Sequence, residues 1–169
     1  DLSVEDPHIE DMYPYGTVAR VMKTLEMPDG TITAIMQGLR RFHLDEILDY
    51  EPYMYGRVSY RTDITADNDS REAKVIADAI KDRTASLMKM GGFIPKETVN
   101  AIRSIDDLEF LTNFIATTVE TENYAEKIAL LSEDDILRRA MALLKQLDNQ
   151  LELMKIKQDI NAKVKSEID

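Results

Sequence analysis

The sequence contains no cysteine and no tryptophan, and only two histidines among its 169 residues. The absence of cysteine excludes disulfides, thiolate zinc sites and cysteine nucleophiles together. It is also compatible with a reducing compartment, and a cytoplasmic location is expected. The histidines, His8 and His43, do not occur in a His-x-x-x-His or Glu-x-x-His pattern, so no metal site is predicted.

Long apolar runs and an excess of basic residues are also missing. No stretch approaches the roughly 20 apolar residues that span a bilayer, and the opening residues 1–6 are not a signal peptide. No membrane partner is therefore expected. With 32 acidic against 21 basic residues the net charge is −11, which disfavours nucleic acid as a partner and favours a solvated acidic surface.

The motifs of common catalytic and phosphate-binding sites do not occur. There is no Gly-x-x-x-x-Gly-Lys-Ser/Thr loop, no Gly-x-Gly-x-x-Gly turn, no Gly-x-Ser-x-Gly and no Ser-x-x-Lys. The acidic clusters at 67–69, 106–107 and 133–135 fall at expected helix starts, where the macrodipole explains them. A calcium loop at 67–69 would need a following glycine and a terminal glutamate, which are absent. No catalytic residue and no cofactor is predicted, and the chain is not expected to be an enzyme.

The composition changes near residue 65, which divides the chain into segments 1–64, 65–132 and 133–169. An apolar content of 44% with 31% charged residues is typical of a soluble folded domain. The first segment is rich in β-branched and aromatic residues, and Gly56 indicates a bulge or a close backbone approach. We expect strands over 15–27, 31–37, 40–48 and 53–62.

A β-hairpin is predicted around Pro28-Asp29-Gly30. Proline presets φ, aspartate can accept an Asx-type hydrogen bond, and glycine supplies a positive φ. The two flanking apolar runs are the arms of this hairpin.

Helices are predicted after residue 65. Ser70 or Asp69 is a natural N-cap for a first helix that ends at Gly91-Gly92. Its apolar stripe at helical spacing consists of Ala73, Ile76, Ala77, Ile80, Thr84 and Leu87. Pro95 can open a second helix, residues 105–108 start a third, and 125–131 form a short fourth. In the third, Leu108, Leu111, Phe114, Ile115 and Val119 are expected to face inward.

A long last helix is expected from about residue 133 to the terminus, because that stretch has neither glycine nor proline. One stripe covers its first half and comprises Leu137, Ala140, Leu144, Leu147, Leu151 and Met154. A shifted stripe follows, made of Ile156, Ile160, Val164 and Ile168. The first half is expected to pack on the other helices, and the second to project or to pair with a partner.

The methionines near the first helix end offer a candidate binding surface. Met88 and Met90 flank Lys89 just before an apolar corner, and methionine adapts to varied apolar partners. Alternatively, these side chains only cover the junction. On exposure arguments, the candidate contact residues are Met88, Met90, Phe93, Leu151 and Met154.

Three pieces of the sequence resemble the N-terminal domain of ATP-dependent Lon proteases. They are the Gly16–Val21 strand, the Pro28–Gly30 turn and the Gly38-Leu39-Arg40-Arg41 run that closes the second strand. The resemblance implies an α+β fold, in which a PUA-like β-barrel subdomain precedes an α-helical bundle ending in a long C-terminal helix. It further implies that this region precedes an AAA+ ATPase, which uses ATP and Mg, and a protease domain with a Ser-Lys dyad. Its implied partners are unfolded or tagged proteins and other subunits of a hexamer.

Two departures from the family pattern shape these expectations. The family's first strands and Pro-rich opening do not occur here, so the barrel is expected to be partial, with an unpaired sheet edge. The ATPase and protease segments do not occur either, so the chain is expected to be one region of a larger enzyme. A structural oligomerisation module built on the last helix, giving a dimer, and a stand-alone Lon-domain adaptor remain as alternatives.

Overall fold

The structure is a computed structural model that describes residues 3–91, 96–119, 121 and 123–168. The chain divides into two compact units, Asp1–Thr62 and Asp63–Asp169, and each is described by itself.

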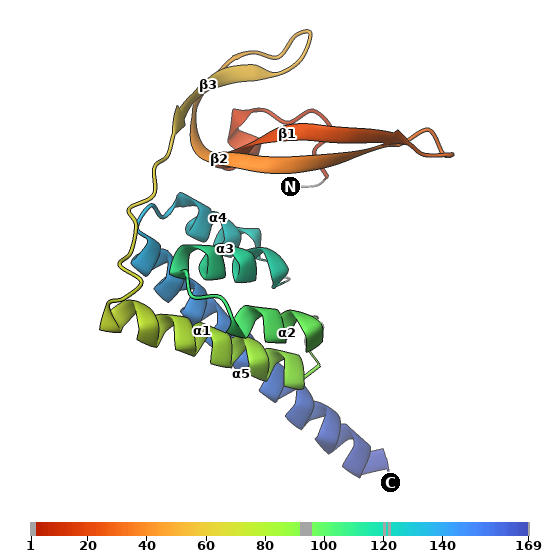
Figure 1. Ribbon diagram of the computed structural model, residues 1–169. Coiled ribbons are helices and arrows are strands. Elements are labelled where there is room, and N and C mark those ends of the chain that lie inside the picture. Colours follow the sequence, from red (N-terminus) through yellow and green to blue (C-terminus); the bar gives the residue numbers. More distant parts are fainter. Residues whose placement is uncertain (1–2, 92–95, 120, 122, 169) are drawn as a thin grey trace. The chain divides into compact units, whose positions relative to one another are not determined.

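The first unit is a three-stranded antiparallel sheet in the order β1-β2-β3 (Figure 1). A short 3-10 helix, η1 (Ile9–Asp11), precedes the strands β1 (Tyr15–Glu26), β2 (Ile32–Asp49) and β3 (Tyr55–Tyr60). The predicted hairpin is confirmed: Gly30 has φ +83°, and Asp29 Oδ1 accepts hydrogen bonds from the Thr31 amide and hydroxyl at 2.9 and 2.6 Å. These two hydrogen bonds hold the pKa of the Asp29 carboxyl below its usual value.

The separate strands predicted over 31–37 and 40–48 are wrong, because β2 runs through both. Gly38 is opposite Ala19 and Arg40 is opposite Val18, which leaves Leu39 as an extra residue in β2. This is a β-bulge, and a bulge bends a strand without ending it. The close approach predicted at Gly56 is confirmed, since a Cβ there would overlap the backbone carbonyl oxygen of Glu46.

The described residues of the second unit form five helices. They are α1 (Arg71–Lys89), α2 (Lys96–Arg103), α3 (Leu108–Thr118), α4 (Tyr124–Ser132) and α5 (Ile136–Ile168). The buried side chains include the whole stripe predicted for the first helix, which packs on α3 and α5. Leu108, Leu111 and Ile115 of α3 are buried as predicted, while Phe114 and Val119 are partly buried against the same core.

The predicted cap of α1 is in place, and α3 has a side-chain cap as well. Ser70 Oγ accepts from the Ala73 amide at 3.2 Å, and Asp107 Oδ1 accepts from the Phe110 amide at 2.6 Å. Gly91, with φ +85°, follows the end of α1. Gly92, Phe93 and Pro95 lie outside the described residues.

The last helix starts at Ile136, three residues later than expected. Ile64 forms a β-bridge with Asp135, and its backbone bonds the Asp134 carbonyl and the Ile136 amide at 2.8 and 3.1 Å. Because these contacts keep residues 134–135 extended, the helix begins only after them. Asp135 caps it, since its Oδ1 accepts a hydrogen bond from the Arg138 amide at 3.1 Å.

The two halves of α5 differ as predicted. Every buried residue of this helix lies between Ile136 and Leu151, and α5 extends well past the ends of the other helices (Figure 1). From Lys155 to Glu167 the described side chains are all exposed. No helix among the described residues combines the length and apolarity that crossing a bilayer requires.

Candidate binding groove

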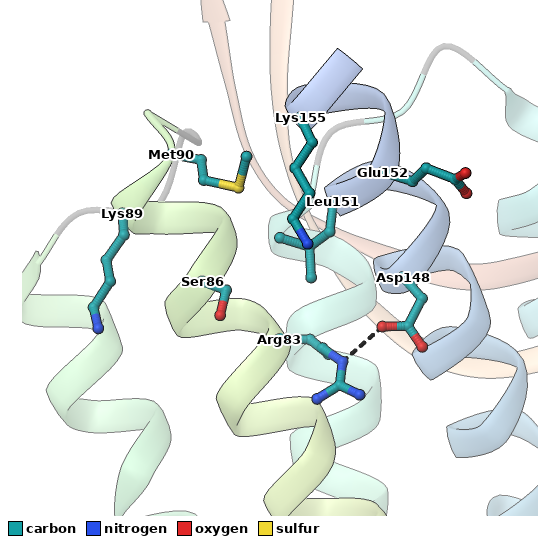
Figure 2. Close-up of a pocket in the computed structure, with 8 residues that line it drawn as sticks. All are labelled: Arg83, Ser86, Lys89, Met90, Asp148, Leu151, Glu152 and Lys155. Carbon is teal, nitrogen blue, oxygen red and sulfur yellow. Dashed lines mark hydrogen bonds and ion pairs between the residues drawn. The ribbon is translucent and has the colours of Figure 1, made fainter. Parts of the chain in front are cut away.

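A groove of about 640 Å³ lies where α1 ends beside α5 (Figure 2). The last turns of α1 supply Arg83, Ser86 and Lys89, with Met90 just after, and α5 supplies Asp148, Leu151, Glu152 and Lys155. The groove forms because α1 ends at Lys89 while α5 continues, so the α5 side chains beyond that level lose their packing partner.

The floor of the groove is apolar. Leu151 is 8% exposed and belongs to the core, while Met90 is half-buried against it with its thioether directed toward α5 (Figure 2). Methionine is flexible and polarisable, so this floor can adapt to apolar side chains of different shape.

An ion pair spans the groove at one end. Arg83 Nε donates to Asp148 Oδ1 at 2.6 Å, and both side chains are about half exposed. Exposed pairs of this kind stabilise a fold by less than about 1 kcal/mol. The pair therefore mainly fixes the position of the two charges. Above it, the Lys155 side chain reaches along α5 toward Leu151, whereas the Glu152 carboxylate points away from α1 (Figure 2).

The structure brings Met90 and Leu151 together in the groove lining and places Met88 and Met154 outside it. Met88 and Met154 pack partly buried against the core, and Phe93 lies outside the described residues. The exposure assumed for Leu151 is wrong, because this side chain is buried in the core of the helical unit. Whether any of the five residues contacts a partner stays a prediction.

Sequence reasoning missed the polar part of the groove. Arg83 and Asp148 are 65 residues apart in sequence. Neither lies in a motif, so no local pattern could have paired them.

A second set of exposed apolar side chains, called the sheet surface, lies on both faces of the β1–β2 ribbon. Its side chains are at least 40% exposed and comprise Val21, Met22, Leu25, Ile32, Ile35, Met36 and Leu39. Val21 is directly opposite Met36 in the strand register, so these two share one face. Alternation in the sequence did not reveal this surface, because an apolar strand residue is normally read as buried.

A polar cluster joins β2 to β3 at His43, Asp45 and Ser59. Ser59 Oγ donates to Asp45 Oδ2 at 2.6 Å, and His43 Nδ1 lies 2.8 Å from Asp45 Oδ1. The Ser59 hydrogen bond first, and then His43, lower the pKa of the Asp45 carboxyl. Serine and histidine both bond the carboxylate rather than each other, so the geometry does not give the hydroxyl a positioned base.

The acidic cluster at 67–69 serves the fold. Asp67 Oδ1 accepts from the Asp69 amide at 2.9 Å, and Asn68 bonds both the Asp107 carboxylate and the Leu108 amide at 3.0 Å. Across the part of the chain that the structure describes, no three His, Cys, Asp or Glu side chains are grouped to hold a metal ion.

The sheet, the helical unit and the apolar groove together define an α+β domain that presents apolar surfaces. A sequence profile described as the ATP-dependent protease La (LON) substrate-binding domain matches residues 1–149. The chain belongs to this family of Lon substrate-binding domains, as the resemblance in the hairpin indicated.

Bacterial Lon proteases are similar over essentially the whole chain. The Lon protease of Porphyromonas gingivalis is 36% identical over 171 residues, and that of Cytophaga hutchinsonii is 35% identical over 165 residues. These alignments cover 100% and 98% of this chain. The chain spans about a fifth, 20%, of the length of each relative.

Two solved structures share the fold. The N-terminal domain of a Mycobacterium avium complex Lon protease aligns with a TM-score of 0.65 over 84% of this chain and 74% of that one. A Lon N-terminal domain protein from Xanthomonas campestris gives 0.55 over 79% and 68%. Both are 20% identical in sequence, and they confirm the predicted α+β fold.

Proposed function

We propose that this chain recognises unfolded protein for a Lon protease, by binding extended apolar segments in the groove between α1 and α5. The observation that carries the proposal is the apolar floor of Met90 and Leu151, open at the end of α1, in a member of a substrate-binding family. A groove of this kind accepts large apolar side chains, which unfolded proteins expose and folded proteins bury.

The chain itself is proposed to be non-catalytic. In the parent enzyme, ATP, Mg and the nucleophile would belong to other domains, and this region would contribute to capture of unfolded or tagged proteins. The purified chain is then expected to hydrolyse neither ATP nor a model peptide. Turnover of either substrate that persists through repeated purification would contradict this part of the proposal.

Binding is tested with the full chain and a labelled, permanently unfolded protein, such as reduced and carboxymethylated lactalbumin, by fluorescence anisotropy. Met90→Ser is expected to weaken binding roughly three- to tenfold, because it removes an apolar contact of about 1 kcal/mol. Met141→Ser is the matched control, since Met141 is 47% exposed on the same helical unit outside the groove lining. Met22→Ser tests the sheet surface in the same way.

The outcomes separate the two surfaces. Loss of affinity in Met90→Ser alone supports the groove. Loss in Met22→Ser with unchanged binding in Met90→Ser would move the contact to the sheet surface and overturn the groove assignment. Absence of binding by the unaltered chain would contradict the proposal as a whole.

Self-association is a second candidate function, favoured by the exposed stripe on the last part of α5. Ile156, Ile160, Val164 and Ile168 recur every four residues and are 48–79% exposed. A continuous apolar stripe on a helix favours pairing with another helix, and such pairing would support a dimer of this chain or the hexamer of a Lon protease. Light scattering on the chain and on an Ile156→Ser/Ile160→Ser variant tests it. An identical monomeric mass for both would contradict this function.

A further inference from the structure

The charged side chains of the groove differ in whether they form ion pairs and in where they point. Arg83 is held by Asp148, and the Glu152 carboxylate points away from α1 (Figure 2). Neither lysine of the lining, Lys89 or Lys155, forms an ion pair with a described residue. Lys89 extends along the side of α1 away from α5, whereas the Lys155 ammonium ends beside Leu151 above the apolar floor (Figure 2). Lys155 therefore places an unpaired positive charge next to the apolar floor.

Two physical effects make this lysine selective. Its methylene stem lies along apolar surface while its ammonium stays hydrated, so a partner carboxylate can reach it without displacing the stem. The net charge of −11 repels acidic partners in general. Charges beyond about 8 Å are largely screened at physiological ionic strength, so a segment bound on the apolar floor interacts mainly with nearby charges such as the Lys155 ammonium.

We propose that the groove selects extended segments in which an acidic residue adjoins a large apolar one. The apolar side chain lies on Met90 and Leu151, and the neighbouring carboxylate pairs with Lys155 Nζ. This inference rests on the proposed function and names the sequence class of its substrates. Complementary charge at a binding rim gives specificity more than affinity, so the expected preference is modest.

The test uses the full chain and short labelled peptides that are unstructured and identical except beside one leucine, where glutamate, glutamine or lysine is placed. We expect the Leu-Glu peptide to bind roughly two- to fivefold more tightly than the Leu-Gln peptide in fluorescence anisotropy, as for a solvent-exposed ion pair. The Leu-Lys peptide should bind most weakly. Added salt should remove the differences.

Lys155→Met keeps the apolar stem and removes the charge. It should abolish the preference for glutamate, so that the Leu-Glu and Leu-Gln peptides bind this variant with equal affinity. Lys157→Met is the matched control: it carries the same change two residues further along α5, where the helical period points the side chain to the opposite face. This variant should keep the preference.

Equal affinity of the unaltered chain for the glutamate and glutamine peptides would overturn the inference, as would a preference that survives in Lys155→Met. In both cases binding of the Leu-Gln peptide leaves the proposed function standing. If none of the peptides bind, the proposed function fails together with the inference.

Discussion

Arg139 is the one charged side chain that the described part of the structure buries almost completely, at 2% exposure. Its guanidinium donates to the Glu133 carbonyl at 2.6 and 2.9 Å, to Asn113 Oδ1 at 3.1 Å and to Asp63 Oδ1 at 2.5 Å. It thereby ties the residues before α1, the middle of α3 and the start of α5 together. A buried cation is tolerable here because its donors are paired.

Replacing Arg139 is expected to destabilise the helical unit. Arg139→Met removes the guanidinium that donates to the Asp63 carboxylate and the Glu133 carbonyl, which should cost about 3 kcal/mol of unfolding free energy. Urea unfolding followed by circular dichroism at the helix band measures the change. Arg138→Met is the control, because Arg138 is exposed on the same turn, and an equal loss in both variants would contradict the role assigned to Arg139.

Glu109 belongs to the same cluster, and its ionised carboxylate is unfavourable there. Burial raises the pKa of its carboxyl above the ordinary 4.5, and the nearby Asp63 and Asp107 carboxylates raise it further. The folded protein therefore binds this proton more tightly than the unfolded chain. Protonated Glu109 contributes favourably to the free energy of unfolding. This contribution is complete below about pH 4.5, the unfolded pKa, and is lost as the pH rises through the folded pKa.

Glu109→Gln is accordingly expected to stabilise the protein at pH 7 by less than about 1 kcal/mol, because the site is only partly buried. Below the unfolded pKa the gain should vanish, since wild-type Glu109 is then protonated. Thermal unfolding at pH 7 and pH 4 measures both values. A lower midpoint for the variant at pH 7 would show that the ionised carboxylate stabilises the fold instead.

At the scale of elements, β2 is the organising strand of the first unit. It pairs with β1 over its first part and with β3 over its second, and the bulge at Leu39 lies on the part that pairs with β1. Gly56 lets β3 approach β2 closely, since any side chain there meets backbone rather than a movable group.

Gly56→Ala is expected to weaken the β2–β3 pairing by about 2 kcal/mol, because the new methyl group overlaps the Glu46 carbonyl. The weaker pairing is measured as faster hydrogen exchange of the β3 amides. Gly38→Ala is the milder control: its Cβ would lie 3.3 Å from Thr17 Cγ2, a side-chain atom that can shift. Equal effects of the two substitutions would refute the steric explanation.

At the scale of the whole molecule, the two units differ in how much apolar surface they bury. Every buried apolar side chain of the described residues belongs to 63–169, and none of the described residues in 3–62 is buried. Small sheets without a packed face are marginally stable in water. The first unit should therefore open more easily than the second.

The unequal distribution of tyrosines and helices allows the stability of each unit to be measured separately. Six of the seven tyrosines lie in the first unit, there is no tryptophan to mask their emission, and the helices lie in the second unit. In urea, tyrosine fluorescence should change at lower concentration than helix circular dichroism. Coincident transitions would show instead that the units unfold as one cooperative body.

Much of the fold was predictable because its signals are local. The Ser70 cap, the α1 stripe from Ala73 to Leu87 and the Pro28–Gly30 turn are each encoded within a few residues. The continuous β2 was not, because a bulge depends on the partner strand. For the groove, Met90 and Leu151 were predicted, while Lys155 was missed because an isolated lysine on a helix carries no sequence signal.

The sequence by itself determined the family, the α+β order of elements and the absence of known catalytic motifs, since these depend on composition, periodicity and contiguous motifs. Only the tertiary structure decided that Leu151 is buried at the floor of the groove, that Arg83 forms an ion pair with Asp148, and that Arg139 is buried. Each of these depends on where α1 ends beside α5 or on how the helices pack. Contacts between residues far apart in the chain follow from the packing of whole elements, which no local pattern specifies.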